Sequence, residues 1–394
     1  MALFEKRVLI DATGASIGGG YTYLVNVIPR LCALAPGAKF RLLLRNQRLV
    51  EVLTPHAERE SNLEITSLPS VGIGARLLHV FFVMPSLAKD WGADVYFSVS
   101  EIAPPNMPCA SIAGFRNANV FTRKTTAPGL RDWLRFNALW CLARLAAWRC
   151  DRIMFVSHAS ASWIGDSLSL PEARRAVIHH GIDADLWSAA EPFRGHPRPY
   201  MLSVSSIYYY KNYVRLIQAY VEVANRIGPA RAPDLIIIGD DYDLAYRAEM
   251  DTAREAAGEL AAQIHILGSV SYEDVMSYYR GAVLFVFPSF LETFGHPLLE
   301  AMAAGTPLVA ADIESFREVA GEAARFAPHD DVGALAAAIE AALDPIVAED
   351  LVRRGKEHIR RFSWDASVAQ LLELFACVIR DRESAANSPA SGEN

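Results

Sequence analysis

Short apolar segments alternate along the chain with longer segments in which apolar residues recur every three or four positions. A short apolar run bounded by turn residues is typical of a buried strand, and the longer pattern is typical of an amphipathic helix. Their alternation over the whole length predicts βαβ units and therefore parallel sheets. The predicted strands form two series: 8–11, 40–44, 95–98, 111–114, 153–156 and 176–179, followed by 200–204, 235–239, 264–267, 284–288 and 307–310.

The two series are separated by the segment EPFRGHPRPY, whose prolines and glycine favour extended, linker-like backbone. A chain of 394 residues is also too long for one ordinary hydrophobic core. We therefore predict an α/β protein with two doubly wound domains, 1–190 and 200–361, joined by a linker at 191–199 and facing an interdomain cleft. Ligands of such sheets bind outside the carboxyl ends of the strands. The polar tail 383–394 is expected to be disordered.

The segment 284–310, LFVFPSFLETFGHPLLEAMAAGTPLVA, predicts a strand, a loop, a helix and a second strand. It places Glu292 at the carboxyl end of the first strand and Glu300 near the first turn of the helix. Free backbone N–H groups at the helix start favour an anion such as a diphosphate, and the carboxylates can accept hydrogen bonds from sugar hydroxyls. The alternative is an exposed glutamate and a second one that only favours the helix dipole.

The stretch SFLETFGHPLLEAMAAGTPLVAA resembles the signature of glycosyltransferase family 4, in which two glutamates flank a Phe-Gly-x-Pro core. The resemblance implies a retaining enzyme of the GT-B fold, with two Rossmann-like domains. It also implies that Glu300 binds the donor ribose, that Glu292 acts catalytically beside the transferred sugar, and that Phe294 and Gly295 contribute to donor binding.

The same resemblance extends to the domains. It implies that domain 1–190 lies on the acceptor side and that domain 200–361 binds the nucleotide sugar. The segment 362–382 is similar to the terminal part of family members, where a helix crosses back to the N-terminal domain.

The segment SSIYYYKNYVRLIQAY predicts a strand end, a loop and a helix, with Lys211 at the loop-to-helix junction. An ammonium group there can neutralise a diphosphate leaving group, although a lysine beside a helix is usually just solvated. The segment resembles the family's second phosphate-binding motif, which implies a catalytic role for Lys211 and donor binding by Asn212. Ser206, in the same donor-binding set, replaces the family's usual arginine. Either another basic residue substitutes for it or leaving-group stabilisation is weaker than usual.

A glycine-rich loop is predicted between the first strand and a helix that begins near Tyr21. Gly18, Gly19 and Gly20 allow close backbone approach to a ligand, and a mobile turn would explain them equally well. The spacing is not that of a dinucleotide fingerprint. In the family the corresponding loop approaches the donor and the acceptor.

Arg116 and Asn117 follow the fourth predicted strand, where family members often present a histidine to the sugar. The histidine's role therefore does not carry over to this chain. We expect both residues on the acceptor side, where Arg116 can bind an anionic group.

The segment IIIGDDYD ends in DYD, two aspartates in an arrangement that also occurs in metal-dependent transferases. We interpret it as an ordinary turn after a strand, because family 4 enzymes generally work without a divalent metal. No cofactor is expected, and the nucleotide diphosphate sugar is a co-substrate. The scattered cysteines indicate neither a disulfide framework nor a structural metal.

Residues 116–152 combine basic side chains with several tryptophans, although the net charge of the chain is −7. One interpretation is a core helix with a charged rim. The other is peripheral contact with an anionic membrane or a lipid-diphosphate acceptor. Neither a signal peptide nor a membrane span is predicted, so we expect a cytoplasmic protein, with or without peripheral binding to the inner face of the membrane. Nucleic acid is not an expected partner.

The resemblance to glycosyltransferase family 4 implies a metal-independent, retaining hexosyltransferase. It would move a sugar, with mannose within the family's range, from a nucleotide diphosphate sugar to a saccharide or lipid-linked saccharide in surface polysaccharide or lipopolysaccharide biosynthesis. Two alternatives stay open at this point: a GT-B epimerase or hydrolase of nucleotide sugars, and an inactive protein that binds nucleotide sugars.

Overall fold

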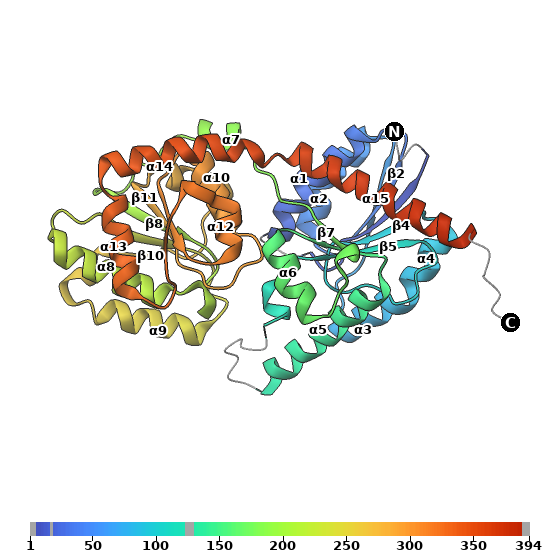
Figure 1. Cartoon of the computed structure of the whole chain (residues 1–394), viewed down its shortest axis with the longest axis horizontal. Helices are drawn as coiled ribbons and strands as arrows, with labels where there is room; N and C mark the ends of the chain where they lie inside the picture. The colour runs from blue at the N-terminus through green and yellow to red at the C-terminus, as the bar shows by residue number, and fades with distance from the viewer. Residues whose placement is uncertain (1–4, 16–18, 123–129, 388–394) are drawn as a thin grey trace. The chain divides into compact units, whose positions relative to one another are not determined.

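The computed structural model describes residues 5–15, 19–122 and 130–387, which form two compact α/β units (Figure 1). Unit 1 comprises Met1–Gly181 and Trp364–Asn394, and unit 2 comprises Ile182–Ser363. The division lies before the predicted boundary at 190, because helix α7 (Ala184–Ala189) packs in unit 2. Its Trp187 is fully buried, and the Trp187 ring lies 5.3 Å from that of Tyr279.

The described part of unit 1 contains a parallel seven-stranded sheet in the order β3-β2-β1-β4-β5-β6-β7. The order reverses between β1 and β4, as in a doubly wound fold. The strands are β1 (Arg7–Asp11), β2 (Lys39–Leu44), β3 (Leu63–Ser67), β4 (Val95–Ser98), β5 (Ala110–Phe115), β6 (Arg152–Phe155) and β7 (Arg175–Val177).

Helices cover both faces of this sheet because successive strand residues point to opposite sides. Val8 and Ile10 pack in one apolar core, whereas Leu9 packs in the other. The first core is covered by α1 (Gly19–Leu34), α2 (Gln47–Arg59) and α15 (Trp364–Asn387), and the second by α4 (Met84–Trp91), α5 (Leu130–Arg149) and α6 (His158–Ser167). The shorter elements are α3 (Ile73–Leu78), the π-helix η1 (His79–Val83) and the 3₁₀ helices η2 (Ala118–Val120) and η3 (Glu172–Arg174).

Helix α15 returns to unit 1 and lies alongside α1 (Figure 1). The Ser367 hydroxyl donates a hydrogen bond of 2.6 Å to the carbonyl of His179. The helix continues to Asn387, so the prediction of disorder was wrong for residues 383–387, where Glu383 forms an ion pair with Lys6. Residues 388–394 lie outside the described part.

The stretch Pro345–Asn387 is long and apolar enough to cross a membrane by length and composition. Half of its most apolar window is nevertheless buried inside the protein. The buried side chains of α15, including Leu371 and Phe375, belong to the core of unit 1. Packing in that core accounts for the apolar character of α15.

Unit 2 contains, among its described residues, a parallel six-stranded sheet in the order β10-β9-β8-β11-β12-β13. Here the order reverses between β8 and β11. The strands are β8 (Tyr200–Val204), β9 (Asp234–Ile238), β10 (Ile264–Ile266), β11 (Leu284–Phe287), β12 (Leu308–Ala311) and β13 (Arg325–Ala327).

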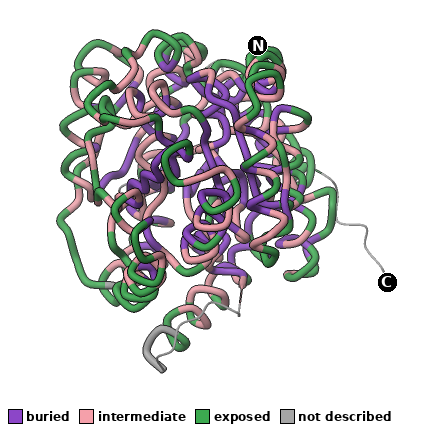
Figure 2. The backbone as a smooth tube through the Cα atoms, turned by 90° about the vertical axis from the view of Figure 1, so that its left-hand side faces the viewer, coloured by how far each residue is buried: buried purple, intermediate pink, exposed green. Residues whose placement is uncertain are grey.

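The helices of unit 2 again lie outside the strands, and Figure 2 shows the buried backbone inside and the exposed turns outside. Beyond α7 they are α8 (Tyr213–Ile227), α9 (Leu244–Glu255), α10 (Tyr272–Gly281), α11 (His296–Ala304), α12 (Glu314–Ala320), α13 (Val332–Ala342) and α14 (Pro345–His358). The 3₁₀ helices are η4 (Tyr209–Lys211), η5 (Gly258–Gln263), η6 (Gly321–Ala323) and η7 (Ile359–Arg361).

The predicted strands are all present, with ends shifted by at most two residues. Two strands were missed, β3 and β13. Both lie at a sheet edge and mix exposed with buried residues, so they lack the continuous apolar run that marks a central strand.

Candidate functional site

The site in unit 2 lies at the carboxyl ends of β8 and β11, the neighbouring strands between which the strand order reverses. The loop after β8 ends in η4, which carries Lys211, and at Asn212 the backbone turns into α8 through the left-handed region (φ 64°). The loop after β11 carries Glu292. Two loops far apart in sequence therefore present their side chains at one edge of the sheet.

Lys211 and Glu292 form an ion pair between the Lys211 Nζ and the Glu292 Oε1 atoms. The Ser289 hydroxyl donates a second hydrogen bond, of 3.1 Å, to the same carboxylate oxygen. Burial alone would lower the pKa of Lys211, but the charge of Glu292 and the hydrogen bond to it raise that pKa above its ordinary value. The lysine is therefore a fixed, buried cation at neutral pH.

Gly295 begins the turn into α11 with φ 95°, a conformation that favours glycine. A Cβ atom there would lie 2.6 Å from the ring of Phe316, so a side chain has no room either. The helix starts at His296, with Pro297 in its first turn. Phe294 is buried immediately before this turn, and within the turn the Leu298 N–H group donates to the carbonyl of Gly295 at 2.9 Å.

Glu300 lies one turn into α11, and its Oε2 atom accepts a hydrogen bond of 2.9 Å from the hydroxyl of Tyr279. Burial raises the pKa of Glu300 to about 7, and the hydrogen bond from Tyr279 offsets part of that rise. The imidazole of His296 lies 4.0 Å from the other carboxylate oxygen, and burial lowers the pKa of His296 to about 4. This oxygen, Oε1, thus faces a neutral imidazole, not a cation.

Asn212 lies at the site, and its side chain forms hydrogen bonds within the protein. Its amide nitrogen donates to the carbonyls of Pro288 (3.1 Å) and His329 (2.7 Å), and its amide oxygen accepts from Arg215 (2.9 Å). These bonds join three loops at the carboxyl edge. The predicted contact of Asn212 with a donor stays a prediction, because its side-chain amide already has these partners.

Ser206 lies partly buried in the loop after β8. This loop runs against Gly239, where a Cβ atom would approach the carbonyl oxygen of Ser205 to 1.9 Å. Of the basic residues near this loop, Arg215 lies in the first turn of α8 and binds Asn212, as described above. Arg215 and Ser289 lie inside the two quoted motif segments and Tyr279 lies outside them, but none of the three was predicted as a site residue.

The two aspartates of the DYD segment have structural partners. Asp243 caps α9 by accepting from the backbone N–H of Tyr246 (3.0 Å), and Asp241 forms an ion pair with Arg247. The turn is therefore stabilised by its own carboxylates.

In unit 1 the glycine-rich segment differs from its prediction. Helix α1 begins at Gly19, so Gly19 and Gly20 are helical and do not belong to the loop, and the predicted start near Tyr21 was late. No atom lies within 4 Å of a Cβ placed on Gly19. Gly18 lies outside the described residues.

Arg116 and Asn117 follow β5 and are both tied to the fold. The guanidinium of Arg116 donates to the carbonyl of Val99 (2.7 Å) and stacks on the ring of Tyr23 at 4.4 Å. The backbone N–H groups of Arg116 and Asn117 donate to the Glu101 carboxylate at 3.0 and 2.7 Å. Their role toward an acceptor stays a prediction.

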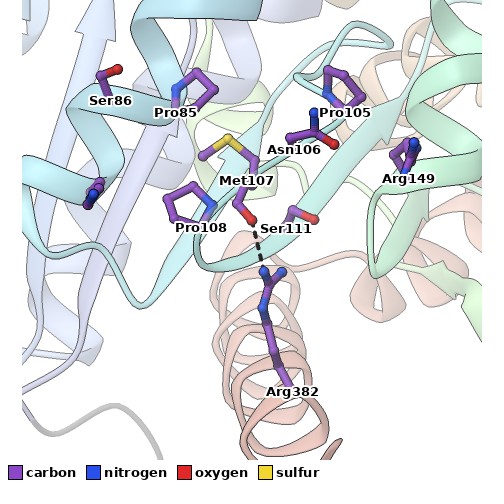
Figure 3. Close-up of a pocket in the computed structure, with 10 residues that line it drawn as sticks. Pro85, Ser86, Pro105, Asn106, Met107, Pro108, Ser111, Arg149 and Arg382 are labelled. Atoms are coloured by element: carbon purple, nitrogen blue, oxygen red, sulfur yellow. Dashed lines mark hydrogen bonds between the residues drawn. The ribbon is translucent and has the colours of Figure 1, made fainter. Parts of the chain in front are cut away.

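The opposite, amino edge of the unit 1 sheet carries an open cavity of about 520 Å³ between α4, the start of β5 and the end of α5. Lys89, Arg149 and Arg382 line it together with apolar residues (Figure 3). Arg382 donates to the carbonyl of Met107 at 2.8 Å, whereas Lys89 is exposed. The cavity is thus basic and separate from the carboxyl edge.

Two family profiles match the chain. The family described as Glycosyltransferase Family 4 matches residues 41–186, and the family described as Glycosyl transferases group 1 matches residues 189–358. The second match contains Lys211, Glu292 and Glu300.

Two curated mannosyltransferases are similar to this chain, one over most of its length and one over a shorter part. The phosphatidyl-myo-inositol mannosyltransferase of Mycolicibacterium smegmatis is 29% identical over 297 residues, 74% of this chain and 74% of that protein. The O-antigen chain mannosyltransferase B of Escherichia coli is 39% identical over 113 residues, 28% of this chain and 30% of that protein.

Among solved structures, Anabaena HepE in complex with UDP and glucose has a TM-score of 0.72 and 15% identity. The match covers 95% of this chain and 100% of HepE. At this identity the likeness shows a shared fold.

Proposed function

Because this chain belongs to glycosyltransferase family 4 and is a glycosyltransferase of the GT-B fold, we propose that its donor is a nucleoside diphosphate hexose and that mannose is the sugar transferred. The observation that carries the proposal is the ion pair of Lys211 with Glu292 at the carboxyl edge of unit 2, followed along the chain by Glu300 on α11, which Tyr279 holds in place. The two similar mannosyltransferases support mannose, and the complexes of HepE with UDP ligands support a nucleotide sugar.

When the donor binds, Lys211 and Glu292 would separate, and each would bind a different part of the donor. The diphosphate takes the ammonium of Lys211, and the hydroxyls of the hexose take the carboxylate of Glu292. The ribose hydroxyls donate to Glu300, whose Tyr279 bond holds the carboxylate in place. Arg215, one turn into α8, is the basic residue that would replace the arginine missing at Ser206.

The reaction breaks the bond between the anomeric carbon and the phosphate oxygen and forms a bond from that carbon to the acceptor oxygen. Lys211 stabilises the charge that collects on the leaving diphosphate. The leaving phosphate oxygen takes the proton of the acceptor hydroxyl on the same face of the sugar, which gives retention. We expect transfer without a divalent metal, because the ammonium of Lys211 can take the place of a metal beside the diphosphate.

The acceptor would be a saccharide or lipid-linked saccharide of surface polysaccharide biosynthesis, bound by unit 1. Helix α5 supports a membrane-associated acceptor: Ala143, Ala146 and Ala147 face the core, while Trp133 and Trp148 are 56% and 68% exposed. Aromatic residues with an apolar body and a polar end suit a headgroup layer.

Elsewhere on unit 1, Phe82 of the π-helix η1 is 71% exposed, and Lys89 and Arg149 line the basic cavity beside α4. Residues 123–129 of the predicted contact surface lie outside the described residues. We propose that the enzyme works in the cytoplasm, bound peripherally to the inner face of the membrane through this part of unit 1.

A thermal-shift panel of nucleoside diphosphates and nucleotide sugars, with and without EDTA, tests the donor, because a ligand of the folded state raises its stability. We expect a base-selective shift that EDTA does not change. The Glu300→Ala variant should bind the donor about 1.5–3 kcal/mol more weakly. Unchanged donor affinity in a folded variant would refute the ribose assignment.

Product analysis with lipid-linked acceptors tests the reaction. An α-linked product from an α-linked donor supports retention. Turnover of the donor without any acceptor would instead support a hydrolase or epimerase. Tight donor binding without turnover across an acceptor panel would support an inactive binding protein, which the serine at position 206 would explain.

A further inference from the structure

A second polar cluster in unit 2 lies at the amino edge of its sheet, opposite the candidate donor site. Asp234 is the first residue of β9, His265 lies in the adjacent β10, and His196 lies in the segment that leads into β8. The three positions are far apart in sequence, so the sequence shows no metal-binding spacing. The pairing of β8, β9 and β10 brings them together.

The ligand atoms of the cluster converge on one point. The Nε2 atoms of His196 and His265 lie 2.8 and 3.2 Å from the same Asp234 oxygen, Oδ2. All three atoms lie within 4.8 Å of one another. In a tetrahedral zinc site with bonds of about 2.0–2.1 Å, neighbouring ligand atoms are roughly 3.3 Å apart. Small side-chain adjustments are therefore enough to admit the ion.

The surroundings hold these ligands in place. Arg198 donates to the other oxygen of Asp234, Oδ1, at 2.6 Å, and to the carbonyls of Pro229 (2.9 Å) and Ala232 (2.7 Å). The Asp234 side chain is only 4% exposed, whereas that of His265 is 32% exposed. Arg198 thus fixes the orientation of the Asp234 carboxylate, as outer partners of metal ligands do. Solvent reaches the cluster on the side of His265.

We propose that His196, Asp234 and His265 form a zinc site that ties the segment entering unit 2 to the edge of its sheet. Two imidazole nitrogens and one carboxylate oxygen are ligands that suit Zn²⁺ and do not suit Mg²⁺ or Ca²⁺, which prefer oxygen. The site lies at the sheet edge opposite Lys211 and Glu292, so its role is structural and it does not depend on the proposed transfer reaction.

The test is titration of the full-length, EDTA-stripped protein with Zn²⁺ in competition with a chromogenic chelator. We expect one equivalent of zinc, bound with an affinity that falls by roughly 100-fold or more in His196→Ala and His265→Gln, because loss of even an outer partner costs roughly 10–100-fold. Zinc should also raise the unfolding temperature of the wild-type protein.

His265→Gln is the variant that keeps the fold, since a glutamine amide can still donate to Asp234. His56→Ala, on α2 of unit 1, removes an imidazole elsewhere and should leave the affinity unchanged. Absence of competition with the chelator, or equal zinc affinity in folded His265→Gln, would show that the cluster is only a hydrogen-bonded network. Donor binding by the stripped protein checks the carboxyl edge separately.

Discussion

The two edges of the unit 2 sheet both bury carboxylates next to cations, but they are built differently. At the amino edge, Asp234 is held by Arg198 and two histidines that sit on or beside strands. At the carboxyl edge, Glu292 and Lys211 lie on loops that lead into helices, whose first N–H groups have no partner within the helix. Buried charge alone therefore does not mark a reactive site. The difference is that Lys211 and Glu292 lie on loops at the carboxyl ends of parallel strands, where such sheets bind ligands, whereas Asp234 lies at the amino edge.

The largest effect is expected from Lys211→Met, which removes the cation that faces the leaving group. We expect kcat to fall by roughly 10²–10³, the scale of losing one preorganised charge-stabilising donor. Steady-state kinetics with a saturating donor would measure it. Lys356→Met, on the exposed surface of α14, is the matched control. A loss of stability with unchanged kcat would place Lys211 among structural groups, like Arg198.

In metal-free protein, Asp234→Asn should lower the stability of the fold and leave donor binding unchanged. The variant keeps an oxygen that can accept from Arg198 but removes the buried negative charge that compensates the guanidinium. We expect the free energy of unfolding to fall by about 3 kcal/mol, the lower end for a broken buried pair because Arg198 is partly exposed. Urea unfolding gives this value, and a nucleotide titration gives the donor affinity. A weakened donor affinity in the folded variant would mean that the two edges are coupled.

Glu300, at the carboxyl edge, should make the stability of the protein depend on pH. The pKa of Glu300 is raised from 4.5 to about 7 by burial, so its contribution is fully present below pH 4.5 and is lost as pH rises through 7. Glu300→Gln should therefore unfold less readily than wild type at pH 8, by up to roughly 3 kcal/mol. Urea titrations at pH 5 and pH 8 measure the difference. An equal difference at both pH values would contradict a raised pKa for Glu300.

The smallest effect concerns unit 1. Its proposed membrane contact uses exposed tryptophans, whereas the two edges of unit 2 use buried charged side chains. The double variant Trp133→Ser/Trp148→Ser should bind vesicles with anionic lipid roughly tenfold more weakly, the scale of burying part of an aromatic side chain. Sedimentation with vesicles measures it. Tyr242→Ser removes a similarly exposed aromatic ring of unit 2 and should change nothing. If the wild type and both variants bind the vesicles equally, the exposed tryptophans of α5 do not contact the membrane.

Much of the candidate site could be predicted from local sequence. Glu292 and Glu300 lie in one strand-loop-helix segment, and the glycine at 295 is required by its backbone angle and by the Phe316 ring. Ser289 and Tyr279 could not be predicted, because their hydrogen bonds to these carboxylates depend on how loops and helices pack. The position of Arg116 after a strand could be predicted. Its hydrogen bond to Val99 could not, because Val99 follows a different strand.

The sequence by itself determined the alternation of strands and helices, the existence of two units and the segment that carries the paired glutamates. These follow from local apolar periodicity and turn residues, which act over a few positions. Only the tertiary structure decided that β8 pairs with β11, so that Lys211 meets Glu292, and that β9 pairs with β10, so that Asp234 meets His265. Strand order depends on burial shared between distant segments, and no local pattern records it.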